Sequence, residues 1–189
     1  MLVKKRRDLI IAAAKSLDES RMIRFSEEAE TFAATDLGRI SSHYYVKQET
    51  VLTFNEQLKP SMRESDILGT LSQASEFENV QVREEEMPEL ETLQSTYCFI
   101  PVKGGIENKH GKVNVLLQAF LSNAPIDGFA LVTDSAYIAQ NGQRIFRCLF
   151  EIVLKRGWVS IAEDLLKFSI MMERRMWHKQ HPLRFVLNS

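Results

Sequence analysis

The chain has 189 residues, with 24 lysines and arginines against 25 aspartates and glutamates, and a net charge of −1. This length suits one domain, or one domain and a fragment of another. The only two cysteines, Cys98 and Cys148, are too few for a disulfide framework, and we interpret them as buried thiols. No apolar run reaches the roughly 20 residues of a membrane span, and glycine and proline are few, so we expect an intracellular, mainly α-helical protein with no membrane partner.

The first 35 residues predict a helix followed by a β-hairpin. Apolar residues recur at three- and four-residue spacing through residues 3–17, which is typical of a helix. Residues 22–25 and 31–35 have the composition of short strands, with a charged segment between them. This order is found at the end of a winged-helix module, so we interpret residues 1–35 as the C-terminal part of one.

From Asp36 onward the pattern is helical almost to the end of the chain. It predicts a multi-helix bundle over residues 36–184, followed by a divergent tail at residues 185–189. Asp36, Thr50 and Asp134 stand where a helix N-cap is expected. We expect the helices at residues 37–46, 51–59, 67–77, 83–97, 113–124, 133–157 and 158–180.

The sequence signals no catalytic or metal site. Gly111 and Lys112 lack the spacing and the following Ser or Thr of a phosphate-binding loop, which favours a surface loop with a left-handed glycine. His178 and His181 lack the third ligand that zinc requires. We therefore expect no catalytic residue, metal or cofactor in this chain.

The longest predicted helix carries a narrow polar stripe. With 100° of rotation per residue, Gln140, Gln143, Arg144 and Arg147 fall on one side and apolar residues fall on the other. Gly142 lies within this helix, although glycine costs about 1 kcal/mol there. Such a stripe suits a nucleic-acid backbone, which Gly142 would let approach closely. The alternative is an ordinary solvent face, and periodicity alone favours that alternative.

Charge is distributed unevenly along the chain. Residues 49–96 hold 3 basic and 11 acidic side chains, whereas residues 140–189 hold 9 basic and 4 acidic ones. A basic C-terminal quarter suits a polyanion, but two segments that pack against each other would give the same pattern. The glutamates of segment 76–91 indicate either a solvated helix face or a docking surface for a basic protein. They are Glu76, Glu78, Glu84, Glu85, Glu86, Glu89 and Glu91.

Five stretches together resemble one family. They are residues 34–45 (ATDLGRISSHYY), 82–86 (VREEE), 111–120 (GKVNVLLQAF), 127–158 and 173–184. As a set they resemble the Sec63-homology region of the large Ski-two-like, tandem-cassette nucleic-acid helicases, over nearly the whole chain. The final residues FVLNS depart from the family pattern.

The resemblance implies an accessory helical domain of an ATP-dependent helicase, which lines the tunnel that guides single-stranded RNA or DNA. The helix with the polar stripe matches the ratchet helix of the family. The implied nucleic-acid-binding residues are Gln140, Asn141, Gln143, Arg144 and Arg147. ATP and magnesium would be bound by RecA-like motor domains that this chain does not contain, so we expect no ATPase activity from it.

The implied partners are single-stranded RNA or DNA, the motor domains of the parent helicase and other subunits of a multiprotein complex. The implied location is the nucleus, with the cytosol as a further site, and the implied processes are transcription and DNA repair. A protein-interaction scaffold of a regulatory helicase cassette is the alternative function. Activity as a stand-alone enzyme is the least favoured of the three functions.

Overall fold

The computed structural model describes residues 2–180, with side chains from residue 5 onward. It confirms a mainly α-helical fold with one short hairpin, and seven α-helices follow the hairpin within this range. The predicted tail at residues 185–189 and His181 lie outside the described residues. In chain order the elements are α1 (Leu2–Glu19), β1 (Ile23–Ser26), β2 (Thr31–Ala34), α2 (Asp36–His43), α3 (Gln48–Gln57), α4 (Glu64–Leu71), the short 3-10 helices η1 (Ser75–Phe77) and η2 (Glu84–Glu86), α5 (Met87–Tyr97), α6 (Lys109–Leu121), α7 (Phe129–Lys155) and α8 (Val159–Arg174).

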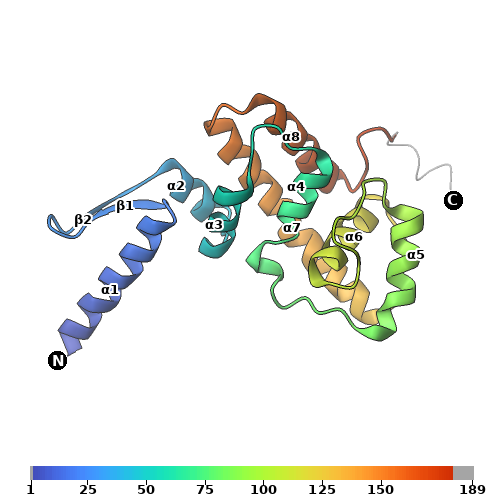
Figure 1. Cartoon of the computed structure of the whole chain (residues 1–189), viewed down its shortest axis with the longest axis horizontal. Coiled ribbons are helices and arrows are strands. Elements are labelled where there is room, and N and C mark those ends of the chain that lie inside the picture. The colour runs from blue at the N-terminus through green and yellow to red at the C-terminus, as the bar shows by residue number, and fades with distance from the viewer. Residues whose placement is uncertain (1, 181–189) are drawn as a thin grey trace.

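The helix α1 and the hairpin form a small unit that projects from the bundle (Figure 1). Strands β1 and β2 are antiparallel, with Phe25 opposite Phe32, and α1 packs against β1. Phe32 and Ile10 are more than half exposed, because this thin unit has no second layer to cover them. The domain boundary after residue 35 stays a prediction.

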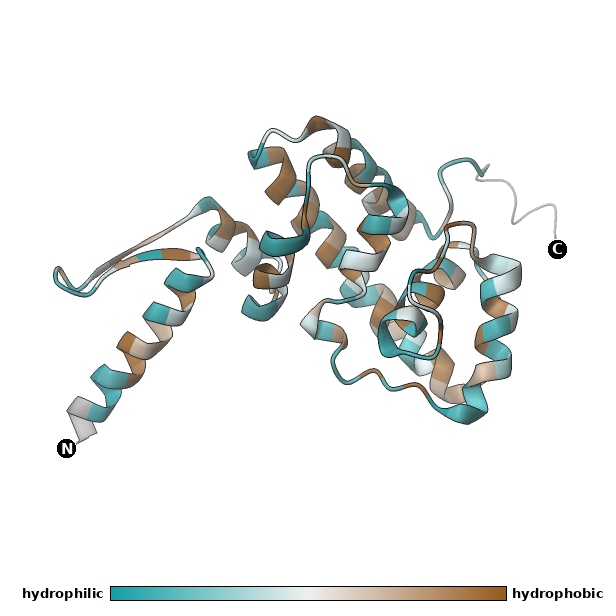
Figure 2. Ribbon diagram, viewed as in Figure 1, coloured by the Kyte–Doolittle hydropathy of each residue, from teal (hydrophilic) through white to brown (hydrophobic). Residues whose placement is uncertain are grey.

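The core lies where α6, α7 and α8 meet. As predicted, α6 is central: almost all of its residues are buried. Phe146 of α7 stacks on Phe168 of α8 with ring centroids 5.0 Å apart. Figure 2 shows hydrophobic turns on these helices inside the bundle, and further ones along α1 outside it. Within residues 2–180, no helix is both long and apolar enough to cross a bilayer.

Three predicted helix caps are wrong. Thr35, rather than Asp36, caps α2, because its hydroxyl accepts a backbone N–H of the first turn at 3.0 Å. Thr50 lies inside α3, where its hydroxyl contacts a buried glutamate of η1. Asp134 lies inside α7 and pairs with the buried lysine of α6. Short polar side chains satisfy distant buried groups as readily as helix ends, and sequence alone does not separate the two uses.

The surface loop expected at Gly111 and Lys112 is found only before these two residues. Gly105 has a left-handed backbone (φ +75°), but Gly111 and Lys112 lie in the first turns of α6. Lys112 is fully buried, and its Nζ lies 2.6 Å from a carboxylate oxygen of both Glu86 and Asp134. Lys112 of α6 therefore links η2 and α7 through two ion pairs.

Candidate nucleic-acid interface

The longest described helix, α7, has a defined start and end and is packed against its neighbours. At its start, the Glu89 carboxylate accepts the backbone N–H groups of Asp127 (2.8 Å) and Gly128 (3.1 Å), where the helix dipole favours a negative charge. At its end, Gly157 adopts the left-handed conformation (φ +72°) that commonly closes helices. Between these points α7 packs against α2, α6 and α8, so its polar face has one fixed position.

Four of the five predicted binding residues reach solvent on this face, and one of them, Arg144, is 32% exposed while it bonds within the protein. Gln140 and Arg147 are exposed, and Gln143 is half-buried. The Arg147 Nη2 lies 2.7 Å from Glu173 Oε2 of α8, and the two side chains are 44% and 57% exposed. An ion pair this exposed contributes at most about 1 kcal/mol. A phosphate can therefore displace Glu173 from Arg147 at little cost.

Asn141 is buried rather than exposed, with 8% of its surface accessible. Its amide nitrogen donates to the Tyr137 carbonyl at 2.9 Å, and its amide oxygen accepts from Arg144 Nη2 at 2.7 Å and Nε at 3.2 Å. Asn141 therefore holds the guanidinium of Arg144 in a fixed orientation.

Arg144 connects α7 to the segment that follows α2. Its Nη1 donates to the carbonyl oxygens of Tyr44 (2.9 Å) and Tyr45, and its Nη2 lies 4.0 Å from Glu76 Oε1. A guanidinium has five N–H groups, and these contacts together with those to Asn141 engage all three of its nitrogens. In this conformation Arg144 positions the backbone that follows α2, although its side chain is still 32% exposed.

Glu76 is a site residue that the sequence placed on a surface. It is only 2% exposed; its carboxylate accepts the backbone N–H of Lys47 at 2.8 Å and the hydroxyl of Thr50. Its own carbonyl accepts the hydroxyl of Tyr137 at 2.7 Å. Since these partners lie up to 61 residues away in the chain, no local pattern could have revealed the cluster.

Gly142 faces the core, so the expectation that it admits a nucleic-acid strand is wrong. A Cβ at this position would lie 2.7 Å from Leu117 Cδ2 of α6 and 3.6 Å from Met172 Cε of α8. The glycine therefore permits close packing of α7 against the two helices behind it.

Glu151, on the same polar face, binds Tyr44. The Tyr44 hydroxyl donates to Glu151 Oε1 at 2.6 Å. Burial and this hydrogen bond raise the pKa of Tyr44 to about 12. Together with the Arg144 contacts, this bond fixes the end of α2 on α7 at two points.

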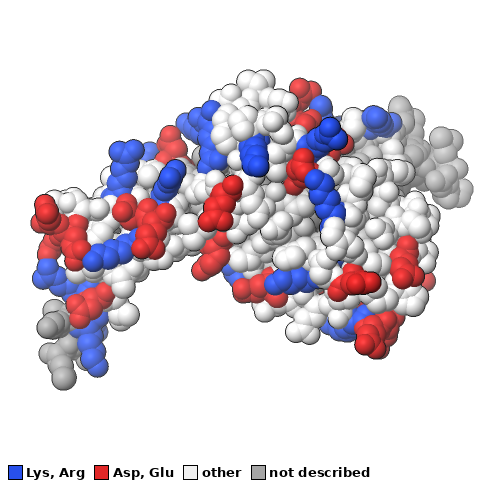
Figure 3. All heavy atoms as spheres, viewed as in Figure 1, with Lys and Arg blue, Asp and Glu red and all other residues white. Residues whose placement is uncertain are grey.

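The acidic segment 76–91 is not a continuous exposed surface. Glu76 and Glu86 are buried, Glu89 caps α7, and Glu78 pairs with Lys47 at 2.8 Å. Figure 3 shows acidic and basic side chains interspersed over the visible face of the molecule. Acidic and basic groups thus pair within the fold, which weakens the case for a docking surface on this segment.

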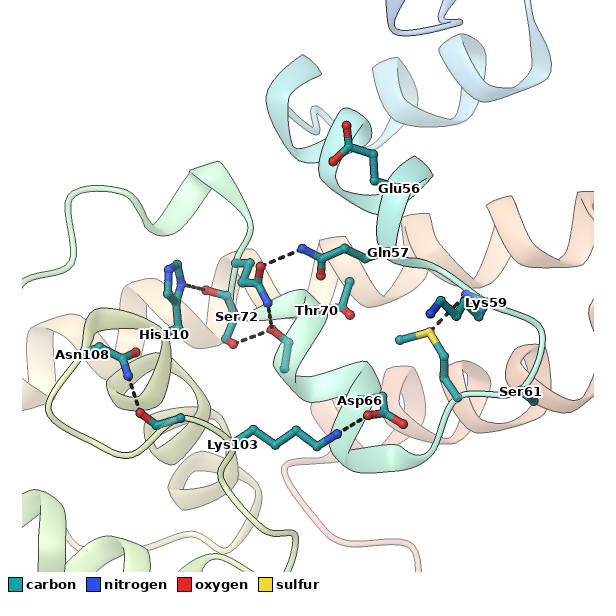
Figure 4. A pocket seen from close by; sticks show the side chains of 14 residues that line it. Glu56, Gln57, Lys59, Ser61, Asp66, Thr70, Ser72, Lys103, Asn108 and His110 are labelled. Atoms are coloured by element: carbon teal, nitrogen blue, oxygen red, sulfur yellow. Dashed lines mark hydrogen bonds and ion pairs between the residues drawn. The ribbon is translucent and has the colours of Figure 1, made fainter.

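A polar hollow of about 800 Å³ lies beside α3, α4 and the loop before α6 (Figure 4). Its polar groups bond to one another: Lys103 to Asp66, Gln57 to Gln73 at 2.7 Å, and His110 to the Ser72 carbonyl at 2.9 Å. Such bonds occur in structural and in catalytic sites alike, so they do not by themselves mark the hollow as an active site. A catalytic role for the hollow thus has no support in its geometry.

The possible metal ligands and the two cysteines show no arrangement that suits catalysis or metal binding in the part of the chain that the structure describes. Within residues 2–180, no group of three or more His, Cys, Asp or Glu side chains is arranged to hold a metal. Cys148 is buried and Cys98 is partly buried, and burial raises the pKa of each thiol to about 12. Thiols with so high a pKa are poor nucleophiles at neutral pH.

Comparisons with known proteins give one consistent family. Residues 34–184 match the family described as the Sec63 Brl domain. Activating signal cointegrator 1 complex subunit 3 of Gallus gallus is 48% identical over 183 residues, which are 97% of this chain and 8% of that protein. The DExH-box ATP-dependent RNA helicase DExH14 of Arabidopsis thaliana is 47% identical over 180 residues (95% and 8%). The U5 small nuclear ribonucleoprotein 200 kDa helicase of Homo sapiens is 43% identical over 184 residues (97% and 9%). The chain thus spans less than a tenth of the length of these relatives.

Proposed function

Since this chain belongs to the Sec63 Brl domain family, we propose that it is an accessory helical domain of a larger ATP-dependent nucleic-acid helicase. Similar curated proteins are named as an RNA helicase and as a small nuclear ribonucleoprotein helicase. In this proposal the sites for ATP and magnesium belong to other parts of the larger protein, and the nucleus is its place of action.

The polar face of α7 is the surface that guides the single strand in this proposal. One observation carries the idea: a helix packed against α2, α6 and α8 presents Gln140, Gln143 and Arg147 to solvent along two turns. Amide and guanidinium groups that contact the sugar-phosphate backbone do so without regard to sequence. A fixed row of such groups suits a strand that moves past it, whether RNA or DNA.

The five predicted residues have two different roles in this proposal. Arg147 binds a phosphate, and Gln140 and Gln143 make polar contacts to the strand. Asn141 and Arg144 are positioning residues, because their polar atoms are bonded within the protein. Arg144→Ala is therefore expected to lower the unfolding midpoint as well as the affinity, whereas Arg147→Ala is expected to change the affinity alone.

A scaffold function is the second candidate, and a different surface supports it. Apolar side chains are exposed along the end of α7 and along α8, namely Leu154, Val159, Leu166 and Ile170. Exposed apolar groups close together commonly mark contacts with other proteins or domains. We assign this surface to the motor domains or to other subunits of a complex, an assignment that is compatible with strand guidance by the polar face.

The test is fluorescence anisotropy with labelled single-stranded RNA and DNA over a range of salt concentrations. Losing one phosphate contact reduces the slope of log K against log salt by about 0.7 for a single strand, so Arg147→Ala is expected to show this change and a weaker affinity. Lys167→Ala is the matched control, because Lys167 also forms an exposed ion pair (2.8 Å to Glu163). An unchanged affinity and slope in Arg147→Ala would contradict the proposal.

A further inference from the structure

Tyr45 occupies a backbone position where a tyrosine is unexpected. It follows the last turn of α2, and its φ is +53°. The hydrogen bonds from Tyr45 N to the Ser42 carbonyl (3.2 Å) and from Val46 N to the Ser41 carbonyl (2.9 Å) close the helix end. Glycine is usual at this left-handed position because a Cβ disfavours it. Asn123 and Arg175, which follow α6 and α8, also have a positive φ, so it is the combination of this backbone with an exposed aromatic ring that distinguishes Tyr45.

Packing does not account for this side chain. Tyr45 is 85% exposed, so its ring gains almost nothing from burial. The preceding Tyr44 is a clear contrast, because its hydroxyl binds Glu151 and its ring lies edge-on to His43 at 4.9 Å. Of two adjacent tyrosines, one thus serves the fold and the other presents its ring to solvent. Strained and exposed residues of this kind are found at functional sites.

The backbone around Tyr45 is fixed to the polar face of α7. The Tyr45 carbonyl accepts from Arg144 Nη1, and Arg144 is one helical turn from Gln140 and three residues from Arg147. On the other side, the backbone N–H of Lys47 donates to the buried Glu76 at 2.8 Å. In Figure 1, α2 lies between the hairpin and the bundle. The backbone that carries the exposed ring is therefore held next to the surface that we propose guides the strand.

We propose that Tyr45 is a base-stacking platform for the single strand that lies along α7. Aromatic rings hold single strands in this way because every base has a flat face, and a strand can step past such a ring whatever its sequence. Arg147 would contact the phosphates while Tyr45 stacks on a base. The inference rests on the proposed function and extends it to a residue outside α7.

The test compares Tyr45→Gly and Tyr45→Trp with the wild-type chain. Glycine suits the backbone at φ +53°, so Tyr45→Gly is expected to unfold at the same temperature or higher, which separates binding from folding. Its affinity for a labelled single strand is expected to fall by about tenfold, and Tyr45→Trp is expected to restore it. Phe129→Ala is the control, because Phe129 is an 87% exposed aromatic at the far end of α7.

A strand with abasic sites separates stacking from phosphate binding. Wild type is expected to bind a strand with bases more tightly than an abasic strand of equal charge, and Tyr45→Gly is expected to lose this preference while keeping the salt dependence. If wild type binds and Tyr45→Gly binds equally well, the stacking role is wrong and the proposed function survives. If wild type binds neither strand at low salt, both are overturned.

Discussion

The buried Lys112 offers a sharp test of how the bundle is held together. Its ammonium group is fully buried and contacts Glu86, which is 5% exposed, and Asp134, which is 22% exposed. Lys112→Met keeps most of the side-chain volume but removes the charge. Glu86 then remains in the interior with only the partly exposed Arg83 as a cationic partner.

Breaking a buried ion pair by removing one partner costs about 3–5 kcal/mol. Because Arg83 still contacts Glu86, we expect the low end of this range, about 3 kcal/mol. A domain of this kind has a total stability of about 5–15 kcal/mol, so the variant still folds but is much less stable. With an m-value of about 2 kcal/mol per molar urea, the unfolding midpoint is expected to fall by about 1.5 M.

Urea unfolding followed by circular dichroism measures this shift. Lys155→Met is the matched control, because it makes the same chemical change at an exposed position of α7 and is expected to change stability by no more than about 0.5 kcal/mol. The double variant Lys112→Met/Glu86→Gln is expected to regain part of the loss, since the buried position 86 then carries no charge that needs the missing lysine. A midpoint shift below about 0.5 M for Lys112→Met would refute the reasoning.

Two further predictions concern stability. Gly142→Val is expected to destabilise the chain by about 1–3 kcal/mol, since even a Cβ would lie 2.7 Å from Leu117; an unchanged urea midpoint would show that α6 and α7 can separate without cost. Burial alone would raise the pKa of Glu86, but hydrogen bonds from its cationic neighbours lower it below the ordinary value of 4.5. Its contribution to stability is therefore present above about pH 4.5 and lost as the pH falls through the lower folded pKa. In thermal scans from pH 6 to pH 3, Glu86→Gln is expected to flatten this acid decline, and an identical decline would contradict the assignment.

Much of the fold is visible in the sequence because buried helices repeat every three to four residues. The helix predicted at residues 133–157 is found at Phe129–Lys155, and the hairpin strands lie within one residue of expectation. The errors concern the ends of helices: the helix predicted at residues 67–77 ends at Leu71, and the one predicted at residues 158–180 ends at Arg174. Helix starts were also misplaced. Asp134 is a residue type that often caps helices, but its carboxylate binds the buried Lys112 instead. The start of α7 is bonded by Glu89, which belongs to α5.

For the candidate site, the sequence predicts only that polar side chains share one face of the long helix. Rotation about a helix axis treats Arg144 and Arg147 alike, because both fall on the same side. The structure separates them: Arg144 reaches the carbonyl of Tyr44, a hundred residues earlier in the chain, whereas Arg147 forms an exposed ion pair. Contacts this distant leave no local pattern, so the sequence indicated neither Glu76 nor the Tyr45 backbone as a partner of Arg144.

The most direct test of the central claim is to locate the strand on the molecule. A photo-crosslinking amino acid placed at Gln143 of this chain would be irradiated with a labelled single strand. The same probe at Thr92, an exposed position of α5, serves as the reference. Strong crosslinks at position 143 and weak ones at position 92 are the predicted result. Equal crosslinks at the two positions, or none at position 143, would contradict the assignment of the α7 polar face.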